Sequence, residues 1–498
     1  MNTTDLPASA VESGGPVEWG GRRTMTDFEA TMWRMGADPR LRSPVAMVEV
    51  LDRTPDWDRF LAAHEWATRV LPLTRMHVVD TPLHLGNPVW AVDPNFDLSL
   101  HVRRQQLPPP ATFEQVLQVC QTEVAEPFDP ARPPWQVLLI EGPEGGPAVY
   151  LIKTHHSLTD GLGGIQLLAL LHSRQRRHTP HEWLGEPPAA EPIGSWGALS
   201  EQVNRGVRAA PARLAATALR TSRTLAALAS RPVSPAVPVR YIRSLNHMLA
   251  PPMCPPSPLL RDRSLSYRFG VLEVTVEALK RAGKAGGGSL NDAYIAALLG
   301  GFRRYHEAMD CPVGKIPMAM PVSMRVGDNP LGGNRFTGAR FSAPADIEDP
   351  LERIEAVHEI VLAVREEPAL DALMLFIPAL SRLPAPLLTG WYAGQSTRLD
   401  LQASNFRGMP VPVYIAGARI ERMFPFGPLP GCAVMVVLAS HCGVCCIGIN
   451  ADPAAVTEPD LFLSCMGAGL DEVLHAGGVT ASRGLPAWRK AWEKSHDR

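Results

Sequence analysis

The chain has 498 residues, which is too long for one ordinary hydrophobic core and predicts two domains. The formal net charge of -2 leaves no overall basic field for a nucleic-acid partner. Eight cysteines in a chain of this length exclude a disulfide scaffold, so we expect a reducing cytoplasm.

Residues 1–21 are polar and lack the basic-then-apolar pattern of a signal peptide, so we expect an N-terminal disordered tail. Residues 22–180 mix helix and strand patterns and form the predicted N-terminal domain. Apolar spacing predicts helices within 57–73 and 113–128, and alternation predicts a strand within 95–108.

The most distinctive stretch of this domain is THHSLTDG, residues 154–161. It follows a short buried strand, AVYLIKT at 148–154, and precedes a helical pattern at 161–174. The loop therefore lies between the carboxyl end of a strand and the N-terminus of a helix. In α/β layers this is a common place for chemistry.

Residues 181–260 change in character and are predicted to be a crossover linker, with proline-rich spacers at 186–195 and 232–239. Between the spacers lies a helical stretch that contains arginines and no acidic residue: Arg205, Arg208, Arg213, Arg220, Arg223 and Arg231. Two interpretations stay open. The stretch is either a basic amphipathic helix for an anionic lipid surface or a crossover helix with solvated arginines.

Residues 261–480 form the predicted C-terminal domain, followed by a tail at 481–498. The segment 264–308 predicts a strand, a helix, a glycine-rich loop and a long apolar helix, with Ser289 or Asn291 as N-cap. A strand within 316–325, a helix within 349–367 and a strand-rich region from 402 follow. The fold class is therefore α/β, with two domains built on mixed β-sheets flanked by helices.

One apolar segment, residues 431–449, is long enough to cross a bilayer. Ser440 and His441 stand at its centre, glycines recur, and valine, cysteine and isoleucine are frequent. These features predict two buried strands around a turn at 441–443. We therefore expect a protein that contacts membranes without crossing them.

The residues of the His-His loop suit general base catalysis. A neutral histidine takes a proton near neutral pH, and Asp160 could orient the imidazole or pair with an arginine elsewhere. Gly161 would allow a sharp backbone bend beside a substrate. Such a loop could activate a hydroxyl for acyl transfer without a covalent serine or cysteine. The chain has no Gly-x-Ser-x-Gly elbow, which argues against a serine hydrolase.

A metal site is the alternative for this loop, with His155, His156 and Asp160 as ligands. Adjacent histidines at a strand end point in opposite directions, so both rarely reach one ion. The HCGVCC stretch at 441–446 lacks a second ligand pair, and no HExxH pattern is present. We expect neither a metal nor a cofactor.

The motif HHSLTDG resembles the His-His-x-x-x-Asp-Gly signature of acyltransferases related to chloramphenicol acetyltransferase and peptide-synthetase condensation domains. Its surroundings resemble the bacterial wax ester synthase/diacylglycerol acyltransferase family. The resemblance runs in the family's order from about residue 25 to 475, through the segments 95–108, 128–142, 289–298, 321–336 and 449–462.

This resemblance implies two chloramphenicol acetyltransferase-like domains with a substrate tunnel between them. It implies an O-acyltransferase that moves a long-chain acyl group from acyl-CoA, as a substrate, to diacylglycerol (triacylglycerol synthesis) or a long-chain alcohol (wax ester synthesis). His156 would be the general base, with His155, Asp160 and Gly161 in support. Asn291 would position the substrate or polarise the carbonyl.

Other matches and departures accompany these roles. Asp160 is expected to pair with Arg325, or failing that with Arg335, and Pro134-Trp135 is expected to shape the structure. The segment 24–33 matches the family's opening pattern loosely. The segment 252–266 lacks the family's Asn-Gly, and 403–414 carries Arg407 in place of a proline-bounded turn. These two loops predict an altered acceptor preference or reduced activity.

Three alternatives remain at this stage. One is an acyltransferase of the same superfamily that takes acyl groups from a carrier protein. Another is a catalytically silent lipid-binding homologue. The third is a membrane glycerol acyltransferase, whose His-x4-Asp spacing His155 and Asp160 also satisfy. We expect a cytoplasmic protein with peripheral contact to a membrane or lipid droplet and no nucleic-acid partner.

Overall fold

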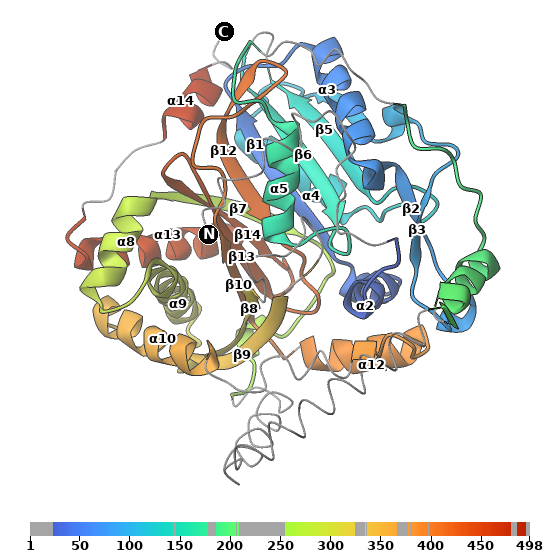
Figure 1. Cartoon of the computed structure of the whole chain (residues 1–498). Helices are drawn as coiled ribbons and strands as arrows, with labels where there is room; N and C mark the ends of the chain where they lie inside the picture. The colour runs from blue at the N-terminus through green and yellow to red at the C-terminus, as the bar shows by residue number, and fades with distance from the viewer. Residues whose placement is uncertain are drawn as a thin grey trace, which may run out of the picture.

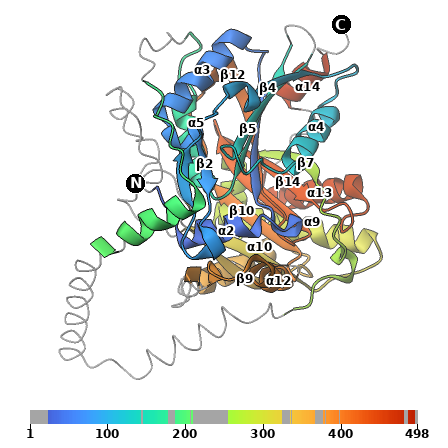
Figure 2. The same cartoon turned by 90° about the vertical axis from the view of Figure 1, so that its right-hand side faces the viewer.

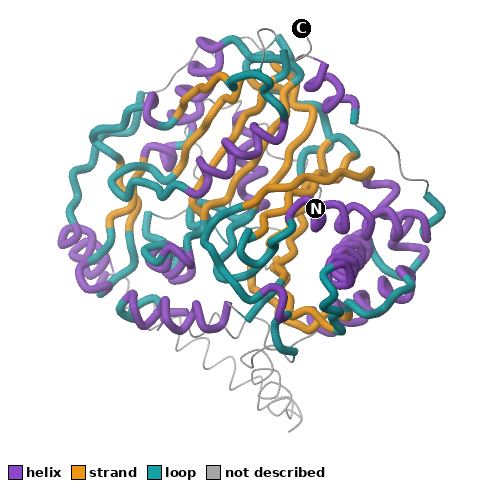
Figure 3. Tube along the Cα trace, turned by 180° about the vertical axis from the view of Figure 1, so that it is seen from behind, coloured by secondary structure: helices purple, strands orange, loops and turns teal. Residues whose placement is uncertain are grey.

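The structure is a computed structural model that describes residues 23–142, 146–177, 186–205, 207–208, 254–323, 334, 336–365, 377–378, 380–396, 398–479 and 486–494. The expected N-terminal tail and most of the arginine-rich stretch lie outside these residues. Two six-stranded sheets with helices around them dominate the fold, and this confirms the predicted α/β class (Figure 1). Figure 3 shows strands through the middle of the molecule and helices around its outside.

The first sheet has the strand order β11-β12-β1-β6-β5-β4. Its strands are β1 (Pro44–Leu51), β4 (Val102–Gln106), β5 (Trp135–Glu141), β6 (Ala148–His155), β11 (Tyr414–Ile415) and β12 (Ala418–Phe426). The helices of this half are α2 (Asp27–Met35), α3 (Trp57–Val70), α4 (Phe113–Ala125) and α5 (Gly161–Leu171). A separate two-stranded sheet pairs β2 (Met76–Val79) with β3 (Val89–Val92).

The second sheet has the order β7-β14-β13-β10-β8-β9. Its strands are β7 (Arg268–Thr275), β8 (Lys315–Ser323), β9 (Phe336–Pro344), β10 (Leu401–Phe406), β13 (Val434–His441) and β14 (Val444–Ala451). Its helices are α8 (Val276–Ala285), α9 (Leu290–Ala308), α10 (Pro350–Arg365) and α13 (Pro459–Ala476), whereas α12 (Ala385–Ser396) packs against α2 of the first half. Short 3-10 turns are η1 (Pro39–Leu41), η2 (Pro72–Arg75), η3 (Pro82–His84), η4 (Leu98–Leu100) and η5 (Pro258–Leu260).

The strand β12 belongs to the first sheet although it comes late in the chain. It pairs antiparallel with β1, from Ala46 opposite Phe426 to Leu51 opposite Ile420. It also lies against β13 and β14, so the two sheets meet along it. The predicted domains, residues 22–180 and 261–480, place residues 418–426 in the C-terminal domain, whereas β12 lies in the first sheet. Strand pairing over such a distance leaves no local pattern in the sequence.

The apolar segment 431–449 folds as predicted. Its residues form most of β13 and β14, which pair antiparallel with His441 opposite Val444. Cys442 (φ 46°) and Gly443 (φ 82°) make the connection. Two successive positive φ values are typical of the tight turns that match the twist of a hairpin. In the part of the chain that the structure describes, no helix has the length and apolar character needed to span a bilayer.

The predicted C-terminal tail is wrong for residues 487–494, which form the helix α14 (Ala487–Lys494). Trp488 and Trp492 are buried, and their rings make edge contacts with Phe113 of α4 at 4.9 and 5.9 Å. The indole of Trp492 also donates to the carbonyl of Ala111 at 2.9 Å. Figure 2 shows α14 and α4 together near the C-terminus. Burial of two indoles stabilises a helix that its short, polar sequence does not suggest.

One predicted boundary changes, and one of the two predicted N-cap candidates is confirmed. The strand expected within 95–108 begins only at Val102, because the side chain of Asp97 accepts from the amide of Ser99 and starts the turn η4. The N-cap of α9 is Ser289, which forms a reciprocal capping box with Asp292. Asn291 lies within the first turn of that helix and is not its cap.

Candidate active site

The loop between β6 and α5 is fixed at both ends by backbone hydrogen bonds. The amide of His155 donates to the carbonyl of Pro134, and that of His156 donates to Ser43, both at 2.9 Å. Pro134 and Ser43 directly precede β5 and β1, the two neighbours of β6. The sheet therefore fixes the backbone positions of both histidines, independently of their side-chain contacts.

His155 points into the protein interior. Its ring lies edge-on to Trp33 at 5.0 Å and to Phe128 at 6.1 Å, and the side chain is buried. The amide of Ser157 donates to His155 Nδ1 at 3.1 Å, with the Ser157 hydroxyl 2.8 Å from the same nitrogen. Burial, and to a lesser extent the neighbouring His156, lowers the pKa of His155 to about 3. His155 is therefore a neutral, structural residue.

His156 lies at the wall of a cavity and contacts a residue far away in the sequence. Its Nδ1 is 3.1 Å from Oδ1 of Asn334, and the Nδ2 of Asn334 donates to the carbonyl oxygen of His156 at 2.8 Å. A second, longer bond runs from that Nδ2 to the carbonyl of Ser157 at 3.3 Å. One amide side chain thus holds both the ring and the backbone of His156.

Asp160 begins the helix α5. Its Oδ1 accepts from the amide of Gly163 at 2.8 Å, and its carbonyl accepts from Gly164 at 2.7 Å. A carboxylate in this position satisfies an otherwise unpaired amide and interacts favourably with the positive end of the helix dipole. Asp160 therefore fixes the angle at which α5 leaves the loop. The predicted arginine partners, Arg325 and Arg335, lie outside the described residues, so that pairing stays a prediction.

Gly161 leaves space for a side chain of the other sheet. Gly161 is the first residue of α5 and has no positive φ. A Cβ atom built there would lie 2.8 Å from Cδ1 of Phe406, a side chain of β10 in the other sheet. The two halves of the molecule come into contact at this glycine.

The cavity beside His156 lies where the two sheets meet. Its volume is about 120 Å³. Residues of both sheets and of α5 line it, and nearly all are apolar or small. They are Val45, Ala46, Met47, Ile152, Thr154, Thr159, Gly164, Ile165, Leu167, Leu168, Ser404, Phe406, Pro425, Phe426, Gly427, Pro428, Met435 and Val437, together with His156, Asp160 and Gly161.

Asn291 is not brought into the described lining of this cavity. Its Oδ1 accepts from Nδ2 of Asn405 at 2.5 Å, and its own Nδ2 faces the sulfur of Met320 at 3.7 Å. Asn405 stands in β10 between Ser404 and Phe406, which do line the cavity. Because side chains alternate along a strand, Asn405 and its partner lie on the opposite face. The catalytic role expected for Asn291 stays a prediction.

The other sequence candidates have structural contacts. Trp135 is buried, its indole donates to the carbonyl of Thr74 at 2.6 Å, and its ring stacks on His101 at 4.7 Å. Among the described residues, no three His, Cys, Asp or Glu side chains gather in a way that could hold a metal ion. Sequence reasoning missed Asn334, which it noted only as part of the segment 321–336. The only signal for its role was that stretch's resemblance to the family.

Comparison with known proteins identifies the family. The model of the wax ester synthase/diacylglycerol acyltransferase catalytic domain matches residues 25–294, and the model of the C-terminal domain of the same family matches residues 332–473. The chain belongs to the wax ester synthase/diacylglycerol acyltransferase family. It is an acyltransferase of that family, and the resemblance drawn from the sequence motifs is confirmed.

Relatives within the family come from Mycobacterium tuberculosis. A protein of strain H37Rv, provisionally named a diacylglycerol O-acyltransferase, is 39% identical over 461 residues and covers 92% of each chain. A second H37Rv protein with the same provisional name is 28% identical over 459 residues, which are 87% of this chain and 93% of that one. The similarity therefore extends over nearly the whole length of both chains.

Solved structures share the fold. The wax ester synthase/diacylglycerol acyltransferase from Marinobacter aquaeolei VT8 superposes with a TM-score of 0.62 at 20% identity, over 92% of this chain and all of that one. The first condensation domain of the CDA synthetase gives a TM-score of 0.56 at 13% identity, over 92% and 97% of the two chains. At these identities the likeness establishes the two-sheet architecture alone.

Proposed function

We propose that this acyltransferase moves a long-chain acyl group from acyl-CoA to the hydroxyl of diacylglycerol or of a long-chain alcohol. The observation that carries the proposal is the position of His156, whose side chain lines a largely apolar cavity built by both sheets. The names of the family and of its M. tuberculosis relatives support these two acceptor classes. The products would be triacylglycerol or a wax ester, with free CoA.

In the proposed reaction, His156 acts as the general base. The neutral imidazole takes the proton of the acceptor hydroxyl while its oxygen attacks the thioester carbonyl carbon. The C–S bond then breaks, and the departing CoA sulfur takes the proton back from the imidazolium. No acyl-enzyme forms. General base catalysis of this kind contributes about 10²- to 10⁴-fold in rate.

The apolar cavity walls explain why the substrates would be long-chain compounds. Each methylene group moved from water into such a wall contributes about 0.8 kcal/mol to binding. Side chains such as Met47, Leu168 and Met435 also exclude water from the region beside His156. Water competes with the alcohol for the thioester, so its exclusion would favour transfer over hydrolysis.

Contact with a lipid surface is a separate part of the proposal. Leu83, within the turn η3, is 87% exposed, and Leu85, directly after it, is 58% exposed. Leu387 on α12 is 63% exposed. The two regions contact each other, since Nδ1 of the His84 side chain lies 3.3 Å from the carbonyl oxygen of Leu383. Exposed leucines of this kind are suited to shallow insertion at the boundary of headgroups and acyl chains. Such contact would give access to acceptors that are dissolved in lipid.

The deciding experiment measures acyl transfer by the purified protein. Palmitoyl-CoA is offered with dioleoylglycerol or hexadecanol, and CoA release and lipid products are followed together. We expect an ester product with at least one acceptor and its loss in His156→Ala. Transfer from an acylated carrier protein and none from acyl-CoA would contradict the proposed donor. An unchanged rate in His156→Ala would contradict the proposed base.

A further inference from the structure

The side chain of Asn334 has an orientation that its surroundings determine. Its amide group makes hydrogen bonds on both sides: one side faces the carbonyl oxygens of His156 and Ser157, and the other faces His156 Nδ1. Only the NH₂ side of an amide can donate to two carbonyl oxygens. The side facing His156 Nδ1 must therefore be the carbonyl oxygen.

The orientation of Asn334 has a consequence for the ring of His156. An amide oxygen can only accept, so His156 Nδ1 must carry a hydrogen for the 3.1 Å contact to be a hydrogen bond. In a neutral imidazole the lone pair then belongs to Nε2. We infer that Asn334 is a positioning residue that sets the tautomer of His156 and makes Nε2 the basic atom. The inference rests on the proposed role of His156 as base.

Asn334 is itself held by the helix α2. Its backbone amide donates to Oε1 of Glu29 at 3.3 Å. The other oxygen of that carboxylate accepts from the amide of Thr26 at 2.9 Å, and the hydroxyl of Thr26 accepts from the amide of Glu29 in return. Glu29 thus completes the capping box of α2 and holds the amide of Asn334 at the same time. Glu29 is buried, so this carboxylate is shielded from solvent.

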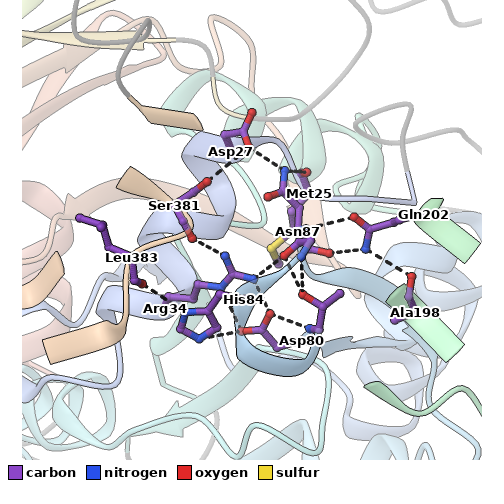
Figure 4. A network of polar contacts seen from close by, with 12 residues as sticks. Met25, Asp27, Arg34, Asp80, His84, Asn87, Ala198, Gln202, Ser381 and Leu383 are labelled. Carbon is purple, nitrogen blue, oxygen red and sulfur yellow. Dashed lines mark hydrogen bonds and ion pairs between the residues drawn. The ribbon is translucent and has the colours of Figure 1, made fainter. Parts of the chain in front are cut away.

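The other end of α2 is fixed by a second polar network (Figure 4). Arg34 is buried and donates to Asp80 Oδ1 and to the carbonyl of Gly86, both at 2.6 Å, and it also donates to the carbonyl of Ser381. Asp80 and Gly86 lie in the segment between β2 and β3, whereas Ser381 is 347 residues from Arg34. With Arg34 held at one end and Glu29 carrying Asn334 at the other, α2 is a firm support for the residue that orients the base.

A neutral amide suits this role better than a carboxylate. Asn334 donates to the carbonyl oxygens of His156 and Ser157. An aspartate at this position would lose these hydrogen bonds and place a negative charge beside the two oxygens. The same charge would stabilise the imidazolium relative to the neutral ring. Asn334 can therefore fix the tautomer without adding a charge beside the base.

The test observes the tautomer directly. Protein labelled with ¹⁵N-histidine is examined by NMR, and the His156 signals are assigned by their loss in His156→Gln. We expect a protonated Nδ1 and an unprotonated Nε2 in the unmodified protein above the pKa of the ring. In Asn334→Ala we expect the proton to be shared between the two nitrogens. Activity should fall by about 10- to 100-fold in kcat, part of the contribution of the base, with KM little changed.

Two further variants distinguish a loss of positioning of His156 from a general loss of stability. Asn334→Asp should move the acidic limb of the kcat/KM profile to higher pH. Gln115→Ala is the matched control, because the amide side chain of Gln115 completes the capping box of another helix, α4, by accepting from the amide of Thr112 at 2.7 Å. It should lower stability and leave the His156 signals unchanged.

The outcomes distinguish this inference from the proposed function. A proton on Nε2 in the unmodified protein, or unchanged His156 signals and activity in Asn334→Ala, would overturn the role of Asn334. If the tautomer is as inferred but His156→Ala keeps full activity, the proposed base fails while the structural assignment stands.

Discussion

The two adjacent histidines of the loop have opposite environments and opposite tautomers. His155 lies among aromatic rings and accepts a hydrogen bond at Nδ1 from the amide of Ser157, so its proton is on Nε2. His156 lines the cavity and donates from Nδ1 to Asn334. Neighbouring side chains at a strand end face opposite sides of the sheet. One motif therefore supplies a structural residue and a candidate base from consecutive positions.

The largest expected effect comes from His156→Ala. Removal of the base should lower kcat by about 10²- to 10⁴-fold while the protein stays folded, because the side chain is only partly buried. Steady-state kinetics and thermal unfolding of the same preparation check both halves of this statement. A large loss of stability in this variant would contradict this comparison, because it would show that His156 also has a structural role.

His155→Ala should have the opposite profile. Its ring fills a space between Trp33 and Phe128, and its loss leaves a cavity and an unpaired Ser157 amide. We expect a loss of about 2–4 kcal/mol in the free energy of unfolding. Urea unfolding measures this loss. A variant with normal stability and no activity would show instead that His155 takes part in the reaction.

The low pKa of His155 predicts a dependence of stability on pH. In the unfolded chain a histidine binds a proton below about pH 6.5, whereas in the folded protein the pKa of His155 is about 3. Between these values the unfolded state binds more protons, so stability falls as the pH falls, by up to about 1.4 kcal/mol per pH unit. His64 has a folded pKa of about 4 and adds to the effect.

Unfolding experiments at pH 7, 6 and 5 test this dependence. His155→Gln should lose less stability over the range than the unmodified protein, because the buried histidine with the pKa of about 3 is gone. Equal losses in both proteins would mean that His155 is protonated in the folded state.

Gly161→Ala should bring the methyl group against Phe406. Overpacking of this kind costs about 1–3 kcal/mol. Phe406→Leu would remove the contact, so the double variant should recover stability relative to Gly161→Ala. A double-mutant cycle by urea unfolding gives the coupling, and additive effects would show that the two residues do not meet.

The smallest effect is expected for Asp160. Its carboxylate caps α5 through the amide of Gly163, so Asp160→Ala should cost about 1 kcal/mol, whereas Asp160→Asn should keep the cap. Unfolding and activity are compared for the two variants. Loss of activity in Asp160→Asn with stability retained would support the predicted pairing with an arginine.

The elements around the loop could be predicted from the sequence because their signals are local. The apolar run before His155 predicted β6, and the helical spacing after Asp160 predicted α5. The hairpin of β13 and β14 was predicted in the same way, from branched residues on either side of a glycine-containing turn.

The contacts of the site could not be predicted, because they join residues far apart in the chain. Asn334 is 178 residues from His156, and no periodicity indicates that the two meet. Gly161 was chosen for a conformational reason, whereas its contact with Phe406 is visible only in the folded structure. Asn291 was chosen because it matches a family motif, but its hydrogen bond with Asn405 is visible only in the folded structure.

The late return of β12 to the first sheet affects how the protein is made. β1 ends at Leu51, but its neighbour β12 begins only at Ala418. A ribosome adding about 5–20 residues per second needs roughly 20 to 70 seconds to cover that interval. For that time one edge of β1 is available to other strands, and such edges promote aggregation. The nascent chain should therefore need a chaperone to cover this edge until β12 is synthesised.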